Sequence, residues 1–393
     1  MSGFQSAQTG DFDKYFMTTT ELIDRYANGG LWGWGANSNG QLGDNTITNK
    51  SSPVQTVAGG TNWRQVAGGS SYTAAIKTDG TLWLWGGIGY GELGDNTRTN
   101  KSSPVQTIAG GTNWRQVATG SSHTAAIKTD GTLWNWGNNQ SGQLGDNTLS
   151  AKSSPIQTVA GGTNWKQVSC GTTHTAAIKT DGTLWLWGVN ATSGALGDNT
   201  YVNKSSPVQT IAGGNNWRQV SGGQYFTAAI KTDGTLWTWG SNGSGQLGDN
   251  TITSKGSPVQ TIAGGNNWRQ VSCGDAHTAA IKTDGTLWLW GDNFLYGQLG
   301  DNTYVDKSSP VQTIAGGTNW KQVEAGSYGT AAIKTDGTLW LWGFNSSGEL
   351  GDNTITSKIS PVQTILRGYN WKQVSCGGAF TTATQYSDIG QVL

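Results

Sequence analysis

The chain has 393 residues, with 24 basic and 24 acidic side chains, so its formal net charge is zero. Of the 24 Lys and Arg residues, 20 recur at three fixed positions of an internal repeat. Charges spread in this way form no basic stripe, and we expect no nucleic-acid binding. No apolar run is long enough to span a bilayer, and the N-terminus lacks the pattern of a signal peptide. We therefore expect that the protein is made in the cytoplasm and does not insert into a membrane.

Residues 1–30 precede the repeat and form a predicted N-terminal arm. Thr18 and Glu21 are spaced as in a capping box, which predicts a short helix through TELIDRYA. Large apolar side chains stand among polar residues, so we expect the arm to pack on the rest of the chain or to dock a partner. We predict attachment through Phe4, Phe12, Tyr15, Phe16, Leu22, Ile23 and Tyr26.

A repeat of 51 or 52 residues fills the chain from 31 to 388 and leaves a short tail, 389–393. Each of the seven copies carries the signatures LWxWG and NWxQV, which together account for all 21 tryptophans. The seven prolines fall in the same register. Self-similarity at a fixed period indicates one supersecondary unit copied along the chain.

One repeat predicts four antiparallel strands, A to D: residues 62–66, 72–77, 81–86 and 104–108. Asp79-Gly80 lies between two β-prone runs and predicts a hairpin with a type I′ turn. Pro104 opens the last run and cannot donate to a ladder, so strand D is expected at an edge. Strand A would be innermost and strand D outermost.

The two ends of the array complete each other. The first LWGWG (31–35) lacks the preceding TAAIKTDG, and the last NWKQV segment (370–388) lacks a following LWxWG. We therefore expect an all-β fold, a seven-bladed β-propeller of four-stranded antiparallel blades. The N- and C-terminal strands would share the last blade and close the ring.

The pattern NWxQVxxGxxHTAAIKTDGTLWxWGxNxxGQLGDNT resembles the repeat of the regulator of chromosome condensation family. The resemblance covers residues 31–388 and implies a seven-bladed propeller. The family includes a nucleotide exchange factor for a small GTPase that also binds chromatin, and that role uses a dedicated wedge, basic loops and a basic tail. The near-identical repeats of this chain carry no such insertion or tail, so the exchange activity is not transferred from the fold.

Residues with catalytic or metal-binding chemistry recur in repeat registers, which favours structural roles. The GDNT aspartates lack the dense ligand run of a calcium loop and predict Asx-turns. The cysteines lie two repeats apart, so no disulfide is expected. The histidines lack converging partners for a metal site or a general base. These predicted structural residues are Cys170, Cys273, Cys376, His123, His174 and His277.

Glu324 is the exception, because it replaces Ala or Ser at its register and is expected to face a central channel. One carboxylate without a partner makes no catalytic set, and its role stays open. The chain has no nucleophile elbow, P-loop or dinucleotide fingerprint. We therefore predict that the protein is not an enzyme and uses no cofactor or metal.

Differences between the copies concentrate in three places: the A–B turn, the tip after LWxWG and the stretch after GDNT. In an A–B–C–D meander the A–B and C–D connections emerge on one face. We predict a recognition face there, for a host-surface glycan or protein. Its candidate residues are Tyr90, Arg98, Tyr201, Tyr225, Phe294, Leu295, Tyr296 and Tyr304.

The lead-in GDFDKYF…ELIDRYA…LWGWG resembles the N-termini of marine tailed-phage structural proteins that carry these repeats. This resemblance implies a virion structural, decoration or adsorption protein, held by the arm to protein partners in a larger assembly. The expected location is the virion, or otherwise the cytoplasm. The alternatives are an intracellular protein-interaction scaffold or guanine-nucleotide exchange factor-like protein, and a glycan-binding lectin propeller.

Overall fold

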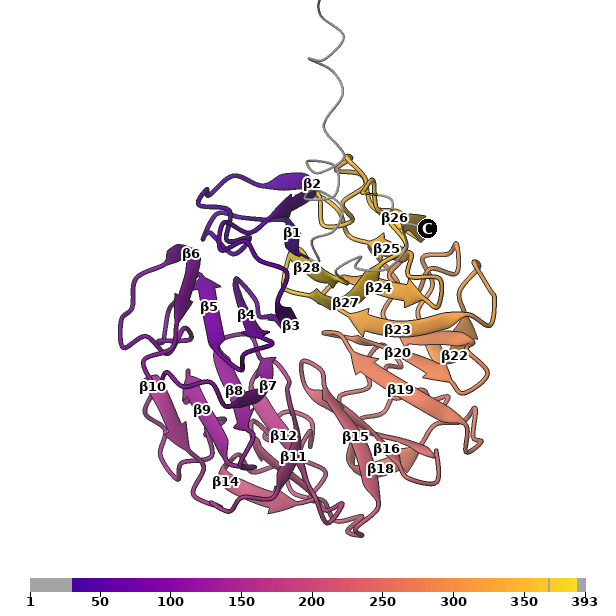
Figure 1. Ribbon diagram of the computed structural model, residues 1–393. Coiled ribbons are helices and arrows are strands. Elements are labelled where there is room, and N and C mark those ends of the chain that lie inside the picture. The colour runs from indigo at the N-terminus through magenta and orange to yellow at the C-terminus, as the bar shows by residue number, and fades with distance from the viewer. Residues whose placement is uncertain (1–29, 367, 387–393) are drawn as a thin grey trace, which may run out of the picture.

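The computed structural model describes residues 30–366 and 368–386. These residues form 28 strands in seven four-stranded antiparallel sheets. The sheets stand as blades around a common axis (Figure 1). The predicted seven-bladed propeller is therefore confirmed. The candidate attachment residues of the arm, its predicted helix and the tail lie outside the described residues.

The blades follow one another along the chain, each running from an inner to an outer strand. Blade 1 contains β3 (Trp63–Gly68), β4 (Tyr72–Lys77), β5 (Leu82–Gly86) and β6 (Lys101–Gln106). Blades 2 and 3 contain β7 (Trp114–Thr119), β8 (His123–Lys128), β9 (Leu133–Gly137), β10 (Lys152–Gln157), β11 (Trp165–Cys170), β12 (His174–Lys179), β13 (Leu184–Gly188) and β14 (Lys204–Gln209).

Blades 4 to 6 repeat the same strand order. They contain β15 (Trp217–Gly222), β16 (Phe226–Lys231), β17 (Leu236–Gly240), β18 (Lys255–Gln260), β19 (Trp268–Cys273), β20 (His277–Lys282), β21 (Leu287–Gly291), β22 (Lys307–Gln312), β23 (Trp320–Ala325), β24 (Gly329–Lys334), β25 (Leu339–Gly343) and β26 (Lys358–Gln363).

Blade 7 joins the two ends of the array. It contains β27 (Trp371–Cys376), β28 (Phe380–Gln385), β1 (Leu31–Gly35) and β2 (Lys50–Gln55), and Figure 1 shows indigo β1 beside yellow β28. Leu31 pairs with Thr384, and Gly35 pairs with Phe380. The predicted closure of the ring by the N- and C-terminal strands is therefore confirmed.

The B–C hairpin is present as predicted, but its turn type is different. Gly80 has a φ of +82° and donates its N–H to the Lys77 carbonyl at 3.0 Å, whereas Asp79 keeps a negative φ. This is a type I turn followed by a left-handed glycine, not the predicted type I′ turn. The side chain of Asp79 accepts hydrogen bonds from the N–H and hydroxyl of Thr81 at 2.9 and 2.7 Å, which hold this geometry.

Strand D is an edge strand as predicted, but it does not begin at the proline. In blade 1 it begins at Lys101, which pairs with Gly86, and the register then shifts before Val105 pairs with Leu84. Between these two pairs, one residue of β5 therefore lies opposite three residues of β6. This irregularity takes Pro104, which has no N–H, out of the regular ladder.

Tryptophan pairs fill the interfaces between blades. The inner Trp114 and the second LWxWG tryptophan, Trp136, are both buried, with ring centroids 6.2 Å apart in an edge-to-face arrangement. Both belong to one buried apolar cluster that also contains Tyr72 and Leu84 of the preceding blade. Apolar cover on both faces of the sheets is thus confirmed, and it gives each blade the same non-polar contact with its neighbour.

Glutamines of NWxQV link the inner strands around the axis. Gln65 donates its amide N–H to the Val117 carbonyl at 2.7 Å, and its amide oxygen accepts the Val117 N–H at 3.1 Å. The same pair closes the ring, where Gln373 bonds Val66. Edge groups of each inner strand are in this way satisfied by the glutamine side chain of the preceding blade.

The GDN loop fastens the outer part of each blade to the following blade. Asp44 accepts hydrogen bonds from the N–H and hydroxyl of Thr46 at 3.0 and 2.7 Å, which confirms the predicted Asx-turn. Lys50 lies 3.6 Å from the same carboxylate. Asn45 has a φ of +61° and donates its N–H to Ser102 of blade 1 at 2.9 Å. Equivalent bonds recur around the ring to Asn353, which bonds Ser51.

Within residues 30–366 and 368–386, no helix is long and apolar enough to cross a membrane.

Candidate functional site

The A–B and C–D connections lie along one edge of each blade. The first residue of the C–D loop donates its N–H to the A–B turn: Gly87 to Ser71 at 2.7 Å in blade 1, and Phe344 to Tyr328 at 2.9 Å in blade 6. The predicted shared face therefore exists. We call it the loop face, and the side that carries the B–C turns is the turn face.

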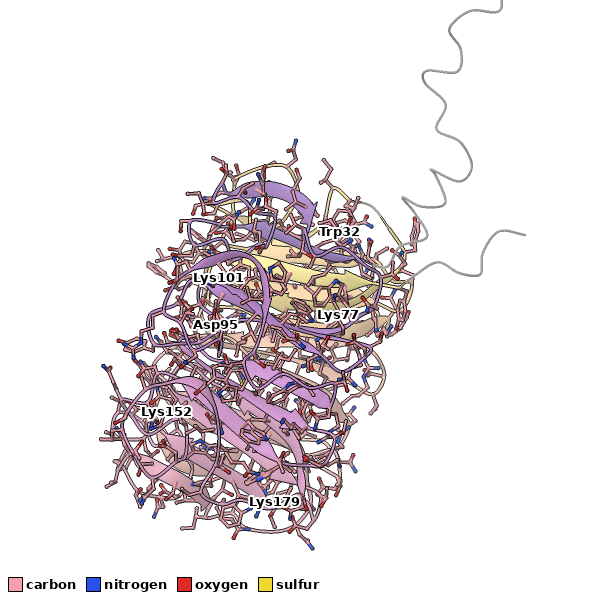
Figure 2. All side chains as sticks on the ribbon, turned by 60° about the vertical axis from the view of Figure 1, so that its left-hand side comes forward. Trp32, Lys77, Asp95, Lys101, Lys152 and Lys179 are labelled. Carbon is pink, nitrogen blue, oxygen red and sulfur yellow. The ribbon has the colours of Figure 1, made fainter. Side chains whose placement is uncertain are left out.

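Figure 2 shows the two sides of the ring. Lys77 and Lys179, which end strands next to B–C turns, lie toward the right-hand side of the view. Asp95, Lys101 and Lys152, which belong to the C–D loops and the strands that follow them, lie toward the left.

Three aromatic rings meet on the loop face between blades 5 and 6. Tyr296 comes from the C–D loop of blade 5, Tyr328 from the A–B turn of blade 6 and Phe344 from the C–D loop of blade 6. The centroid of the Tyr296 ring lies 5.3 Å from that of Tyr328 and 4.7 Å from that of Phe344. We call these three residues the aromatic cluster.

Exposed apolar residues and carboxylates surround the aromatic cluster. Phe294 and Leu295 precede Tyr296 in the same loop and are 68% and 63% exposed. Burial raises the pKa of the Tyr328 hydroxyl, and the charges of Asp275 and Asp292 raise it further. Burial also raises the pKa of the Asp275 carboxyl, against an opposing hydrogen bond from a neighbouring serine. This part of the face is therefore apolar, aromatic and acidic.

The other predicted recognition residues are distributed around the ring. Tyr201 and Tyr304 are exposed, while Tyr90 and Tyr225 are half-buried. The Tyr201 hydroxyl lies 3.2 Å from where a Cβ on Gly256 would stand, so this ring packs on blade 4. These residues and Arg98 come from blades 1, 3, 4 and 5, whereas Tyr296 is brought into the aromatic cluster.

Sequence reasoning missed two members of the cluster, Tyr328 and Phe344. Both stand in the sixth repeat, at the A–B turn SYG and the tip FNSSGE, where the signal was visible as a departure from the other copies. Their contact with Tyr296 crosses a blade boundary, so it depends on the packing of adjacent blades.

The histidines lie buried between blades, as their register predicted. His174 and His277 donate or accept at Nε2 with Thr227 and Thr330 of the next blade, each at 3.0 Å. Burial lowers the pKa of both to about 4, and it lowers that of His123 to about 3. These rings are neutral at physiological pH and fill the interface.

The inner strands enclose a central channel of about 390 Å³. Glu324 lines it as predicted and accepts hydrogen bonds from Ser272 at 3.1 Å and Gln322 at 3.4 Å. Burial raises its pKa to about 7. Cys170, Cys273 and Cys376 also line the channel as free thiols. The described residues contain no group of three His, Cys, Asp or Glu arranged to hold a metal ion.

These observations define a class of protein: a closed seven-bladed propeller with an invariant scaffold and one divergent loop face. The chain belongs to the RCC1-like domain family, because the model of that family matches residues 30–383.

Comparisons with individual proteins agree with this assignment. The ultraviolet-B receptor UVR8 of Arabidopsis thaliana is 34% identical over 328 residues, which cover 81% of this chain and 73% of the receptor. Two solved structures share the fold. Human WBSCR16 has a TM-score of 0.80 at 22% identity, covering 92% of this chain and 100% of that one. Prp20p of Saccharomyces cerevisiae, described with its binding to Gsp1p and histones, has a TM-score of 0.79 at 19% identity, covering 94% and 95%.

Proposed function

We propose that this protein is a non-enzymatic protein-interaction scaffold that docks a partner on the loop face of blades 5 and 6. The observation that carries the proposal is the aromatic cluster with Phe294 and Leu295 exposed beside it. Large aromatic side chains at a rigid surface are the residues that dominate binding free energy at protein interfaces. The family supports a binding role, since Prp20p is described by its binding to Gsp1p and histones.

The scaffold under this surface is pre-organised. The base of the blade 5 loop is held by Asn293, whose amide donates to Asp301 at 3.0 Å and to the Thr303 carbonyl at 2.9 Å. The Asn293 amide oxygen also accepts the Leu299 N–H at 2.9 Å. A loop fixed in this way loses little conformational entropy when a partner binds.

Quantitative co-purification from cells of the source organism tests the proposal. The double variant Tyr296→Ser/Tyr328→Ser removes the cluster, and Leu149→Ser changes an exposed apolar side chain in the C–D loop of blade 2. We expect the recovered amount of at least one partner to fall about tenfold or more with the double variant, because interface anchors are lost. The recovery of that partner should be unchanged with Leu149→Ser. Equal recovery of every partner with both variants would overturn the proposal.

The virion role inferred from the arm is a second proposal with less support, because the relatives described above are plant, human and yeast proteins. Mass spectrometry of purified particles tests it, and absence from the particles contradicts it. Nucleotide-release assays on small GTPases test an exchange factor-like role. A glycan array tests the lectin alternative.

A further inference from the structure

Blade 6 differs from the other blades at the first residue of strand B. At this position each of the other blades places a ring that fills the space against the next blade: Tyr72, His123, His174, Phe226, His277 and Phe380. In blade 5, for example, the His277 ring lies 3.0 Å from the Thr330 hydroxyl of blade 6. Blade 6 has Gly329 instead, so its interface with blade 7 lacks the ring.

The missing ring leaves a socket of about 30 Å³ that opens beside the aromatic cluster. Its walls include Tyr328 and Phe344 of blade 6 and Phe380 and Thr381 of blade 7. A Cβ built on Gly329 would meet a single neighbour, the Trp342 carbonyl at 3.1 Å. A space of this size accommodates one or two groups as large as a water molecule or an ammonium.

Glu349 is one of the residues that line the socket, and one oxygen of its carboxylate has no hydrogen-bond partner. The residue is 7% exposed. Its Oε2 accepts the Ser347 N–H at 2.9 Å, whereas its Oε1 is buried and unpaired. Burial raises the pKa of this carboxyl. Among the described residues that line the socket there is no Lys, Arg or His to compensate the charge.

The fold does not require a carboxylate at this position. The equivalent residue is Gln in four repeats and Ala in one, and the other repeat with a carboxylate has Glu92 in blade 1. There the socket is filled by Tyr72, and Glu92 Oε2 accepts the N–H groups of Gly89 and Tyr90 at 3.0 and 2.8 Å. Gln298 also leaves its amide oxygen unpaired. A neutral amide oxygen costs much less to bury unpaired than a carboxylate does.

We infer that this socket binds the primary ammonium of a lysine side chain supplied by a protein partner, with Glu349 as its counter-charge and Tyr328 and Phe344 as aromatic walls. A carboxylate satisfied by an N⁺–H donor and rings that face a cation both stabilise such a group. Asp275 and Asp292, whose charges act on Tyr328, make the approach favourable for a cation and unfavourable for an anion. An aromatic guest would leave Oε1 unpaired, and the planar guanidinium of arginine is larger than the space. This inference rests on the proposed function.

Nuclear magnetic resonance of glutamate carboxyl carbons tests the socket directly. The chain has four glutamates, so ¹³Cδ labelling gives four signals that single Glu→Gln variants assign. With n-butylammonium as the probe, we expect a saturable shift of the Glu349 signal with a Kd in the range of roughly 1–10 mM, as for a ligand of so few atoms. The Glu92 signal serves as a matched control in the same spectrum and should not follow this curve.

Two further measurements define the occupant. Gly329→His refills the socket with the ring that three repeats already use, and we expect it to weaken n-butylammonium binding by about tenfold or more. The neutral probe n-butanol and the larger n-butylguanidinium should bind more weakly than n-butylammonium to the unmodified protein. The inference is overturned if the Glu349 signal shows no saturable shift or if the Glu92 signal shifts equally. It is also overturned if Gly329→His binds n-butylammonium as tightly as the unmodified protein does, or if n-butanol or n-butylguanidinium binds as tightly as n-butylammonium.

The outcomes separate this inference from the proposed function. If the cluster variant loses partners in co-purification but Glu349 does not respond to the ammonium, the socket assignment alone is wrong. If Glu349 responds but no partner depends on the cluster, the socket binds ammonium and the proposed docking face is wrong.

Discussion

The turn face and the loop face are built by the same repeat but differ in how much the copies vary. On the turn face of blade 1, Lys77 lies between two tryptophans, with its Nζ 4.8 Å from the Trp63 ring and 4.9 Å from the Trp83 ring. The same arrangement recurs at Lys334 in blade 6. On the loop face the bases of the loops are equally uniform, but the tips carry different side chains. Residues that recur in every repeat therefore maintain the ring. We expect binding at the loop tips, where side chains that differ between repeats stand on a rigid base.

The largest expected effect comes from the scaffold shared by both faces. Trp85 is fully buried, and its Nε1 donates to the Gln41 carbonyl at 2.9 Å. Trp85→Ala leaves a cavity and removes this hydrogen bond, and it should lower the free energy of unfolding by about 3–5 kcal/mol in denaturant titrations. Trp83→Ala, at a half-buried site on the turn face, should cost clearly less. Equal costs for the two variants would contradict this ranking.

Acid should destabilise the loop-face side of the blades through the buried histidines. Because burial lowers the pKa of His174 and His277 to about 4, the unfolded chain binds more protons than the folded one below the ordinary histidine pKa of 6.5. The free energy of unfolding is thus highest above that pH and falls as the pH drops toward 4, by at most about 3 kcal/mol per histidine. The triple variant with His123, His174 and His277 changed to Phe, as in blades 4 and 7, should flatten the stability profile between these pH values. A profile unchanged by the triple variant would show that the rings are not the source.

The GDN loops should contribute a second, smaller acid sensitivity at lower pH. Partial burial alone would raise the pKa of Asp146, but hydrogen bonds from Thr148 and Asn139 and the charge of Lys152 outweigh it and leave the pKa below its ordinary value. A lowered carboxyl pKa stabilises the fold above the unfolded pKa of about 3.9, and this stabilisation is lost as the pH falls through the folded value. Asp146→Asn should cost about 1–2 kcal/mol at neutral pH and less at pH values below the folded pKa. A constant cost across this range would contradict the electrostatic explanation.

The smallest effect on stability is expected on the loop face itself. Phe294 and Leu295 are exposed, so Phe294→Ser/Leu295→Ser should change the free energy of unfolding by no more than about 0.5 kcal/mol. The same variant should reduce partner recovery in co-purification. A large loss of stability would mean that these side chains serve the fold and not a partner.

The repeat predicted most of the fold because its signals are local. The period, the Asp79-Gly80 hairpin and the alternating tryptophans placed the strands of each blade, and the truncated end repeats predicted the closure. The start of strand D was missed because Lys101-Ser-Ser is polar and carries no β-strand signal. The apolar residues begin only after Pro104, so the sequence pattern predicts a strand that begins at the proline. The turn type was missed because an Asp-Gly pair is compatible with both turns.

The candidate site was predicted in part. Tyr296 was singled out by the variability of its loop, but its contacts with Tyr328 and Phe344 join two blades and have no sequence period. The socket was not foreseen, because Gly329 reads only as one more substitution at a varied turn. The glycine creates the proposed cation site only together with the buried carboxylate of Glu349, which lies 20 positions further along the chain.

Site-specific photo-cross-linking tests the central claim most directly. A benzophenone side chain would be placed at Phe294 in blade 5 and, as the matched control, at Gln140, an exposed position of the equivalent loop tip in blade 2. The proposal predicts a discrete protein adduct from position 294 in cells of the source organism, absent from position 140 and lost when Tyr328 is changed to Ser. No adduct from position 294, or the same adduct from both positions, would contradict a binding site on blades 5 and 6.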